Sequence, residues 1–207
     1  MPDYSFEEEA MRAGYALIAG TDEAGRGPLC GDVVAAAVIL PVGLEIPGLN
    51  DSKKLSEKKR EALFDIIKEK AISYGVASAS VQEIDEMNIL NASQLAMRRA
   101  VAMLDPQPDF VLVDGNIARD FSLPTRTVIG GDALSASIAA ASILAKVTRD
   151  RMCIEWDRAY PLYGIAGHKG YGTKAHIEAL KTYGPSPIHR RDFLVKILAG
   201  TPFEVKE

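Results

Sequence analysis

The sequence predicts an α/β fold, because short runs of β-branched residues and alanine alternate with longer segments of helical periodicity. The short runs end at glycine or proline, as buried strands do where they enter loops. The 207 residues can enclose one core with a small appendage, and 47% hydrophobic with 25% charged residues is typical of a folded globular protein. We therefore expect one main α/β body followed by a helical appendage.

Five apolar runs are predicted to be strands. They cover residues 15–21, 33–40, 76–81, 110–113 and 125–129. The run at 33–40 is continuous and ends at Pro41, which is typical of a central strand covered on both faces. The first run is followed by glycine-rich residues and so should leave the core through a loop.

Helices are predicted between and after these strands. Ser56 can cap one helix, and a second should cover residues 91–104. Residues 133–156 contain neither glycine nor proline, and they predict a long helix with Asp132 as its N-cap. Thr173 can cap a further short helix. We expect a main domain over residues 1–157 and a C-terminal helical appendage over residues 158–207 that contributes substrate contacts.

The composition excludes several classes of protein. The formal net charge of −4 argues against a protein that coats nucleic acid, although lysine and arginine are frequent in the last third. The longest apolar run, 33–40, is too short to cross a membrane, and the acidic N-terminus does not resemble an export signal. Cys30 and Cys153 lack the spacing of a zinc, haem or disulfide motif. We expect a cytoplasmic protein without membrane contacts.

Four acidic residues stand at predicted strand ends or turns. Asp22 and Glu23 follow the first strand, Asp114 follows another, and Asp132 opens the long helix. Carboxylates that converge on a sheet rim repel one another unless a cation neutralises them. Oxygen ligands without histidine or cysteine favour Mg²⁺ or Mn²⁺, and such ions suit phosphodiester hydrolysis. Each residue taken alone has a structural alternative as a turn or N-cap residue.

The neighbouring positions of Asp22 and Glu23 raise a geometric difficulty. Adjacent side chains on a regular strand point to opposite faces, so both cannot reach one metal from an ideal strand. We therefore expect the strand to bend there, or Glu23 to contribute through its backbone carbonyl. Gly25 and Gly27 make a bend plausible.

A glycine loop and a tyrosine are candidates for contacting a sugar. Gly25, Arg26 and Gly27 lack the spacing of a nucleotide-binding loop, but their backbone could approach a ribose 2′-hydroxyl; a tight turn is an equally good interpretation. Tyr171 lies between glycines in a basic loop, where it could stack on a sugar or base. It could instead simply anchor the loop.

Further candidates would bind phosphate. Ser52 and Lys53 combine a hydroxyl with an ammonium group, although a solvated turn is the alternative. Lys146 and Arg149 share a helix stripe with the fourth carboxylate and could meet a phosphate backbone, whereas a solvated polar face would look the same. The basic residues at 189–191 are interpreted as surface charge.

Several ordered blocks resemble ribonuclease HII and cover nearly the whole span from residue 20 to residue 191. They occupy residues 20–28, 50–55, 113–115, 131–150, 168–174 and 184–191. The resemblance implies a ribonuclease H-like fold with a mixed central β-sheet flanked by helices and a C-terminal helical appendage. It also implies that the four metal-site carboxylates are Asp22, Glu23, Asp114 and Asp132.

The family's activity implies a substrate as well. Enzymes of that family cut a nucleic-acid strand on the 5′ side of a ribonucleotide and leave a 3′-hydroxyl and a 5′-phosphate. The expected partner is an RNA/DNA hybrid or a DNA duplex containing ribonucleotides, with Gly25, Arg26 and Gly27 at the sugar and Tyr171 stacking on it. No motif fixes the oligomeric state, and we expect a monomer. The alternatives are a two-metal DNA nuclease or recombinase-like protein, and a non-enzymatic hybrid-binding module.

Overall fold

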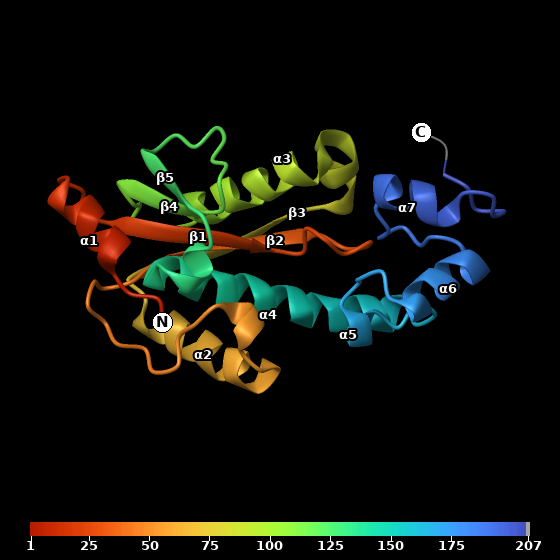
Figure 1. Cartoon of the computed structure of the whole chain (residues 1–207), viewed down its shortest axis with the longest axis horizontal. Helices are drawn as coiled ribbons and strands as arrows, with labels where there is room; N and C mark the ends of the chain where they lie inside the picture. Colours follow the sequence, from red (N-terminus) through yellow and green to blue (C-terminus); the bar gives the residue numbers. More distant parts are fainter. Residues whose placement is uncertain (206–207) are drawn as a thin grey trace.

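A five-stranded mixed β-sheet lies between two helical layers in the computed structural model, which describes residues 1–205 (Figure 1). Residues 206–207 of the predicted appendage lie outside this range. The strands are β1 (Ile18–Ala24), β2 (Val33–Ile39), β3 (Ser73–Ala79), β4 (Phe110–Asp114) and β5 (Thr125–Val128), in the order β3-β2-β1-β4-β5. The first three pair antiparallel, whereas β4 and β5 extend the sheet parallel to β1.

Helices cover both faces of this sheet. α4 (Ala136–Ala159) and α2 (Glu57–Lys70) lie on one face, and α3 (Val81–Ala102) covers the other (Figure 1). Every residue of β2 is buried, as predicted, because its side chains alternate between the two helical layers. Gly20 allows β1 to approach α4 closely, since a Cβ atom there would lie 2.3 Å from the backbone nitrogen of Ile138.

The C-terminal segment packs on the end of α4 that is distant from the N-terminus (Figure 1). It contains α5 (Ile165–His168), α6 (Lys174–Tyr183) and α7 (Arg191–Leu198). The remaining elements are α1 (Ser5–Arg12) and the short 3-10 turns η1 (Ser52–Lys54) and η2 (Gly131–Ala133). Within residues 1–205, no helix is both long and apolar enough to cross a membrane.

The start of the long helix differs from the prediction. Asp132 is not its N-cap; it belongs to η2, and Ser135 caps α4 by accepting a hydrogen bond from the backbone N–H of Ile138. The Ser135 hydroxyl in turn donates to the buried carboxylate of Glu7 at 2.7 Å. This contact joins residues 128 positions apart, so local sequence could not reveal it. The shift frees Asp132 from a capping role.

Two further helices were incompletely predicted. α3 begins ten residues before the expected start at 91, with a capping box in which Ser80 and Glu83 bond each other's backbone N–H. Asn88 has a left-handed backbone (φ 69°) that kinks this helix and interrupts its periodicity. α1 lies in the N-terminal region, for which no helix was predicted.

Candidate active site

The sheet register places two of the predicted carboxylates side by side. β1 and β4 pair in parallel, so that Asp22 and Asp114 occupy neighbouring positions at the end of the pairing. Two residues before them, Gly20 and Leu112 both face Ile138 of α4. Since side chains alternate along a strand, Asp22 and Asp114 share this face of the sheet.

Asp132 joins the same region from η2. It is only 5% exposed, and one carboxylate oxygen accepts a hydrogen bond from the Lys53 ammonium group at 3.1 Å. Lys53 comes from η1, where the Asp51 side chain accepts from its backbone N–H. The turn that precedes α4 and the turn that precedes α2 therefore meet beside the ends of β1 and β4.

Glu23 reaches the site from a strand whose pairing is unbroken. β1 remains paired with β2 through Ala24, and Glu23 lies opposite Ala35, which packs on the α3 face. Because β4 ends at Asp114, the end of β1 has no neighbour on that side, and the Glu23 side chain lines the same cavity as Asp114. Its carboxylate lies 3.4 Å from the Arg26 guanidinium. The pairing therefore shows no break at residues 22–23, where a bend was predicted, and the backbone becomes left-handed at Gly25 (φ 104°).

The electrostatics of these carboxylates favour a bound cation. Burial, followed by the charges of Glu23 and Asp114, raises the pKa of Asp22. Burial also raises the pKa of Asp114, with a further contribution from Asp132, and it raises the pKa of Glu23 despite the opposing charge of Arg26. Each ionised form is thus disfavoured by low polarity and like charge.

The donor set fits a hard divalent ion. One oxygen of Asp114 is buried and has no hydrogen-bond partner among the described residues. Carboxylate oxygens are the ligands that Mg²⁺ and Mn²⁺ prefer. Across residues 1–205, no three of these carboxylates have oxygens that all lie within 4.8 Å of one another. A single ion held by three of them would therefore have to draw them closer, whereas two ions could each be held by a different pair.

A cavity of about 200 Å³ brings the predicted substrate-binding residues to the same place. Asp132 adjoins it through Lys53. The residues that line the cavity include Asp22, Glu23, Gly25, Arg26, Gly27, Ser52, Lys53, Asp114, Lys146, Arg149 and Tyr171. Tyr171 is 50% exposed, and a Cβ atom at Gly27 would lie 3.3 Å from its ring, so that the tyrosine covers the glycine loop closely.

Two basic residues that line this cavity form hydrogen bonds with other parts of the protein. Arg149 is 1% exposed and donates hydrogen bonds to the carbonyls of Cys30, Asp32 and Lys169 at 3.0–3.2 Å. The Lys146 ammonium group lies 2.6 Å from the Asp150 carboxylate. Arg149 thus holds loops together in this structure, and its position does not support the predicted phosphate contact. The polar stripe expected along α4 is largely buried.

The interpretation of residues 189–191 as surface charge is wrong for two of them. His189 is 4% exposed and Arg190 is completely buried, whereas Arg191 is exposed. Their acceptors lie on other segments, so no spacing within the sequence signals their burial.

His189 belongs to a buried cluster with His176 and Cys30, whose potential ligand atoms all lie within 4.8 Å of one another. The hydrogen-bond partners of His176 and His189 imply that both imidazoles are neutral and that each ring nitrogen donates or accepts one hydrogen bond. His176 Nδ1–H donates to the Tyr171 carbonyl, His189 Nε2–H donates to His176 Nε2, and His189 Nδ1 accepts from the Ser186 N–H, each at 3.0 Å. A hydrogen-bonded network therefore accounts for both histidines of this cluster without a metal ion.

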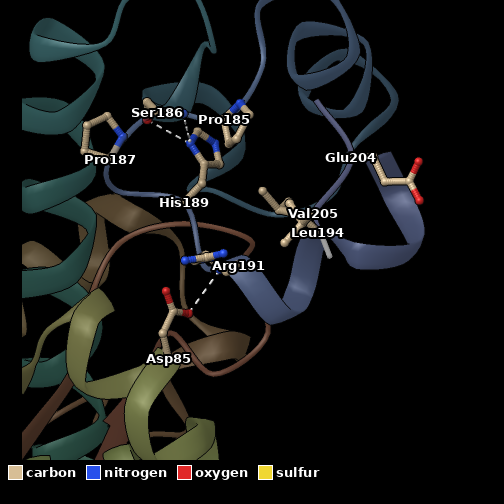
Figure 2. A pocket seen from close by; sticks show the side chains of 9 residues that line it. All are labelled: Asp85, Pro185, Ser186, Pro187, His189, Arg191, Leu194, Glu204 and Val205. Carbon is tan, nitrogen blue, oxygen red and sulfur yellow. Dashed lines mark hydrogen bonds between the residues drawn. The ribbon is translucent and has the colours of Figure 1, made fainter. Parts of the chain in front are cut away.

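A larger cavity, about 710 Å³, lies beside α7 (Figure 2). Figure 2 shows His189 bonded to Ser186 in its wall and the backbone N–H of Arg191 donating to Asp85. Its acidic residues, Asp85 and Glu204, lie far apart in this view. Size alone does not make this cavity the active site, since the convergent carboxylates line the smaller one.

Comparisons with known proteins agree with this geometry. The family model for ribonuclease HII matches residues 19–196. A ribonuclease HII from Marinomonas sp. is 60% identical over 89% of this chain and 94% of its own length. One from Acetivibrio thermocellus is 57% identical over 91% of this chain and 73% of its own. The crystal structure of ribonuclease H2 from Pyrococcus horikoshii superposes with a TM-score of 0.69 and 29% identity, covering 86% of this chain and 93% of that one.

Proposed function

This chain belongs to the ribonuclease HII family of endonucleases, which cleave RNA in RNA/DNA hybrids, and we propose that it also cuts duplex DNA 5′ of single embedded ribonucleotides. The products would be a 3′-hydroxyl and a 5′-phosphate. The observation that carries the proposal is the meeting of Asp22, Glu23 and Asp114 with the glycine loop and Tyr171 in one cavity. A metal site and a sugar-recognition site are thereby adjacent.

Enzymes of this family need divalent metal ions, and the proposed ion is Mg²⁺ or Mn²⁺. Two bound ions would supply a nucleophilic water at neutral pH and would neutralise charge on the departing 3′-oxygen. Asp22 and Asp114 are the proposed shared ligands because they are adjacent on one face of the sheet. Asp132 would hold the ion nearest the water, and Glu23 would help to select the scissile phosphate. The protein's own contribution is chiefly to position these groups.

We assign recognition of the ribonucleotide to the glycine loop and Tyr171, which line the same cavity as the carboxylates. The backbone of Gly25, Arg26 and Gly27 can approach the 2′-hydroxyl because the glycines carry no side chains. Tyr171 would stack on the sugar, and Ser52 and Lys53 would contact phosphate from η1. Every group in this scheme comes from one chain, so we propose that a monomer is active; light scattering during size-exclusion chromatography tests this.

Cleavage of a defined duplex tests the function. A DNA duplex with one ribonucleotide is incubated with Mg²⁺, Mn²⁺ or EDTA, and the product ends are mapped. Metal-dependent cleavage 5′ of the ribonucleotide is expected from the wild type and from Asp65→Asn, which alters an exposed carboxylate of α2. Asp114→Asn should bind the duplex without measurable turnover.

The same assay separates the alternatives. Cleavage of an all-DNA duplex of identical sequence would favour a DNA nuclease. Duplex binding without turnover in either metal would favour a hybrid-binding module. Retained turnover by Asp114→Asn would refute the assignment of the metal site.

A further inference from the structure

All five N–H groups of Arg190 are directed at one loop. The Nε–H and one Nη2–H donate to the Gly31 carbonyl at 2.9 and 2.7 Å, and the other Nη2–H donates to the Gly25 carbonyl at 2.7 Å. The two Nη1–H groups donate to the carbonyls of Arg26 and Pro28 at 3.1 and 2.8 Å. Within residues 1–205, no carboxylate lies within 4.0 Å of this completely buried guanidinium. Its partners are therefore dipoles of the loop at residues 25–31.

This arrangement determines where the loop's amides point. In a planar trans peptide the carbonyl of one residue and the N–H of the next point in opposite directions. Since the carbonyls of Gly25 and Arg26 face Arg190, the N–H groups of Arg26 and Gly27 point away from it. Among the described residues, neither N–H donates to a backbone carbonyl. These residues border the carboxylate cavity, so two adjacent donors are free on its side.

The backbone of Arg190 is also connected by hydrogen bonds to the loop that carries Tyr171. Its N–H donates to the Leu29 carbonyl at 3.0 Å, and the Leu29 N–H donates to the Gly170 carbonyl at 2.8 Å. Gly170 precedes Tyr171, whose ring covers Gly27. Both walls of the sugar-recognition site are thus connected to one residue of the C-terminal segment.

We propose that Arg190 is a positioning residue for ribonucleotide discrimination. By turning the loop's carbonyls inward, it presents the Arg26 and Gly27 N–H groups to the 2′-hydroxyl oxygen and an adjacent phosphate oxygen. A deoxyribose leaves one of these donors without an acceptor, which penalises DNA at this position. The inference rests on the proposed function, and it assigns the orientation of the loop to a residue distant from the cleavage chemistry.

The test replaces Arg190 by lysine. Arg190→Lys retains the charge, but an ammonium group with three donors cannot span four carbonyls in a fixed fork. The matched control is Arg191→Lys, at the next position, where the side chain is exposed and only the backbone N–H contacts Asp85 (Figure 2). Two constants are measured in Mg²⁺: KM for the single-ribonucleotide duplex, and the inhibition constant of the all-DNA duplex as competitor.

The wild type and Arg191→Lys should bind the ribonucleotide duplex in preference to DNA. Arg190→Lys should lose at least tenfold of this preference through a higher KM, while the inhibition constant of the all-DNA duplex changes less than twofold. An unchanged preference, or an equal loss for both duplexes, overturns the inference, because a general structural role would weaken both alike. A wild type that cleaves no ribonucleotide duplex refutes the proposed function itself.

A second measurement does not depend on the folding of a variant. Amide hydrogen exchange is followed by NMR in full-length Asp114→Asn, which should bind without cleaving. The Arg26 and Gly27 amides should exchange rapidly in the free protein and become protected by the ribonucleotide duplex only. Slow exchange in the free protein, or equal protection by the all-DNA duplex, contradicts the proposed orientation.

Discussion

The clustered carboxylates predict that one inactivating substitution will stabilise the metal-free protein. Asp114→Asn removes a negative charge next to Asp22, whose pKa is raised by burial and then by the charges of Glu23 and Asp114. A raised carboxyl pKa means that the folded state binds the proton more tightly than the unfolded chain does. The ionised form therefore costs stability at neutral pH, and this cost fades as the pH falls.

The size of the effect follows from the charge removed. Two like charges roughly 5 Å apart repel by about 3 kcal/mol at an effective dielectric constant near 20. Part of this gain is lost, because the amide at position 114 would still be largely buried and has one oxygen site without a partner. We expect a net gain of about 1–2 kcal/mol in the free energy of unfolding. For a domain of this size, that corresponds to a Tm increase of about 2–8 °C.

Thermal unfolding followed by circular dichroism checks this prediction in EDTA and in Mg²⁺. In EDTA, Asp114→Asn should melt above the wild type. In Mg²⁺ the difference in Tm between the variant and the wild type should become smaller or change sign, since the wild type gains more stability from ion binding. A variant that melts below the wild type in EDTA would show that the carboxylates do not repel one another appreciably. Asp65→Asn, on the exposed surface of α2, should leave the Tm within about 1 °C under both conditions.

Three further predictions concern other parts of the site and its support. Tyr171→Ala should weaken binding of the ribonucleotide duplex by about 5- to 100-fold through lost stacking, whereas Tyr183→Ala, at a similarly exposed tyrosine, should leave the Kd unchanged; equal effects would argue against stacking. Burial, followed by a neighbouring histidine, lowers the pKa of His189 to about 4, so the unfolded chain takes up its proton first, and the contribution of His189 to the free energy of unfolding should fall by about 2 kcal/mol from pH 7 to pH 5, opposite in sign to the trend of the buried carboxylates. Urea unfolding measures this loss, which should be smaller in His189→Gln. With the duplex at saturating concentration, so that a lost phosphate contact does not limit cleavage, Lys53→Met should lower the Mg²⁺ concentration for half-maximal cleavage severalfold, because the lysine competes for Asp132; a higher requirement would contradict this competition.

Local patterns were sufficient for much of the fold and for the convergence of two of the predicted carboxylates. Local composition predicted three elements that the structure contains: the strand around Val33–Ile39, the strand around Phe110–Asp114 and the long helix. Tertiary contacts did not override these local preferences. Asp22 and Asp114 follow apolar strand residues, and parallel strands bring such positions to one rim. Their convergence was therefore predictable from element order.

Other features were unpredictable because their partners are distant in the chain. Ser135 rather than Asp132 caps α4, with Glu7 as its buried partner. Arg149 and Arg190 stand among other basic residues, a pattern typical of a solvated surface, yet both are buried. Backbone carbonyls, which no sequence pattern distinguishes, satisfy their donors.

The sequence by itself determined the α/β class, the carboxylates that can hold divalent ions and the glycine loop that can approach a sugar. These properties depend on residue type and on periodicity along the chain. Only the tertiary structure decided that Glu23 reaches the cavity from a strand that stays paired in register, and that Arg190 orients the loop from the C-terminal segment. The physical reason is that hydrogen-bond direction and burial arise from contacts between segments far apart in sequence, and such contacts exist only after the chain has folded.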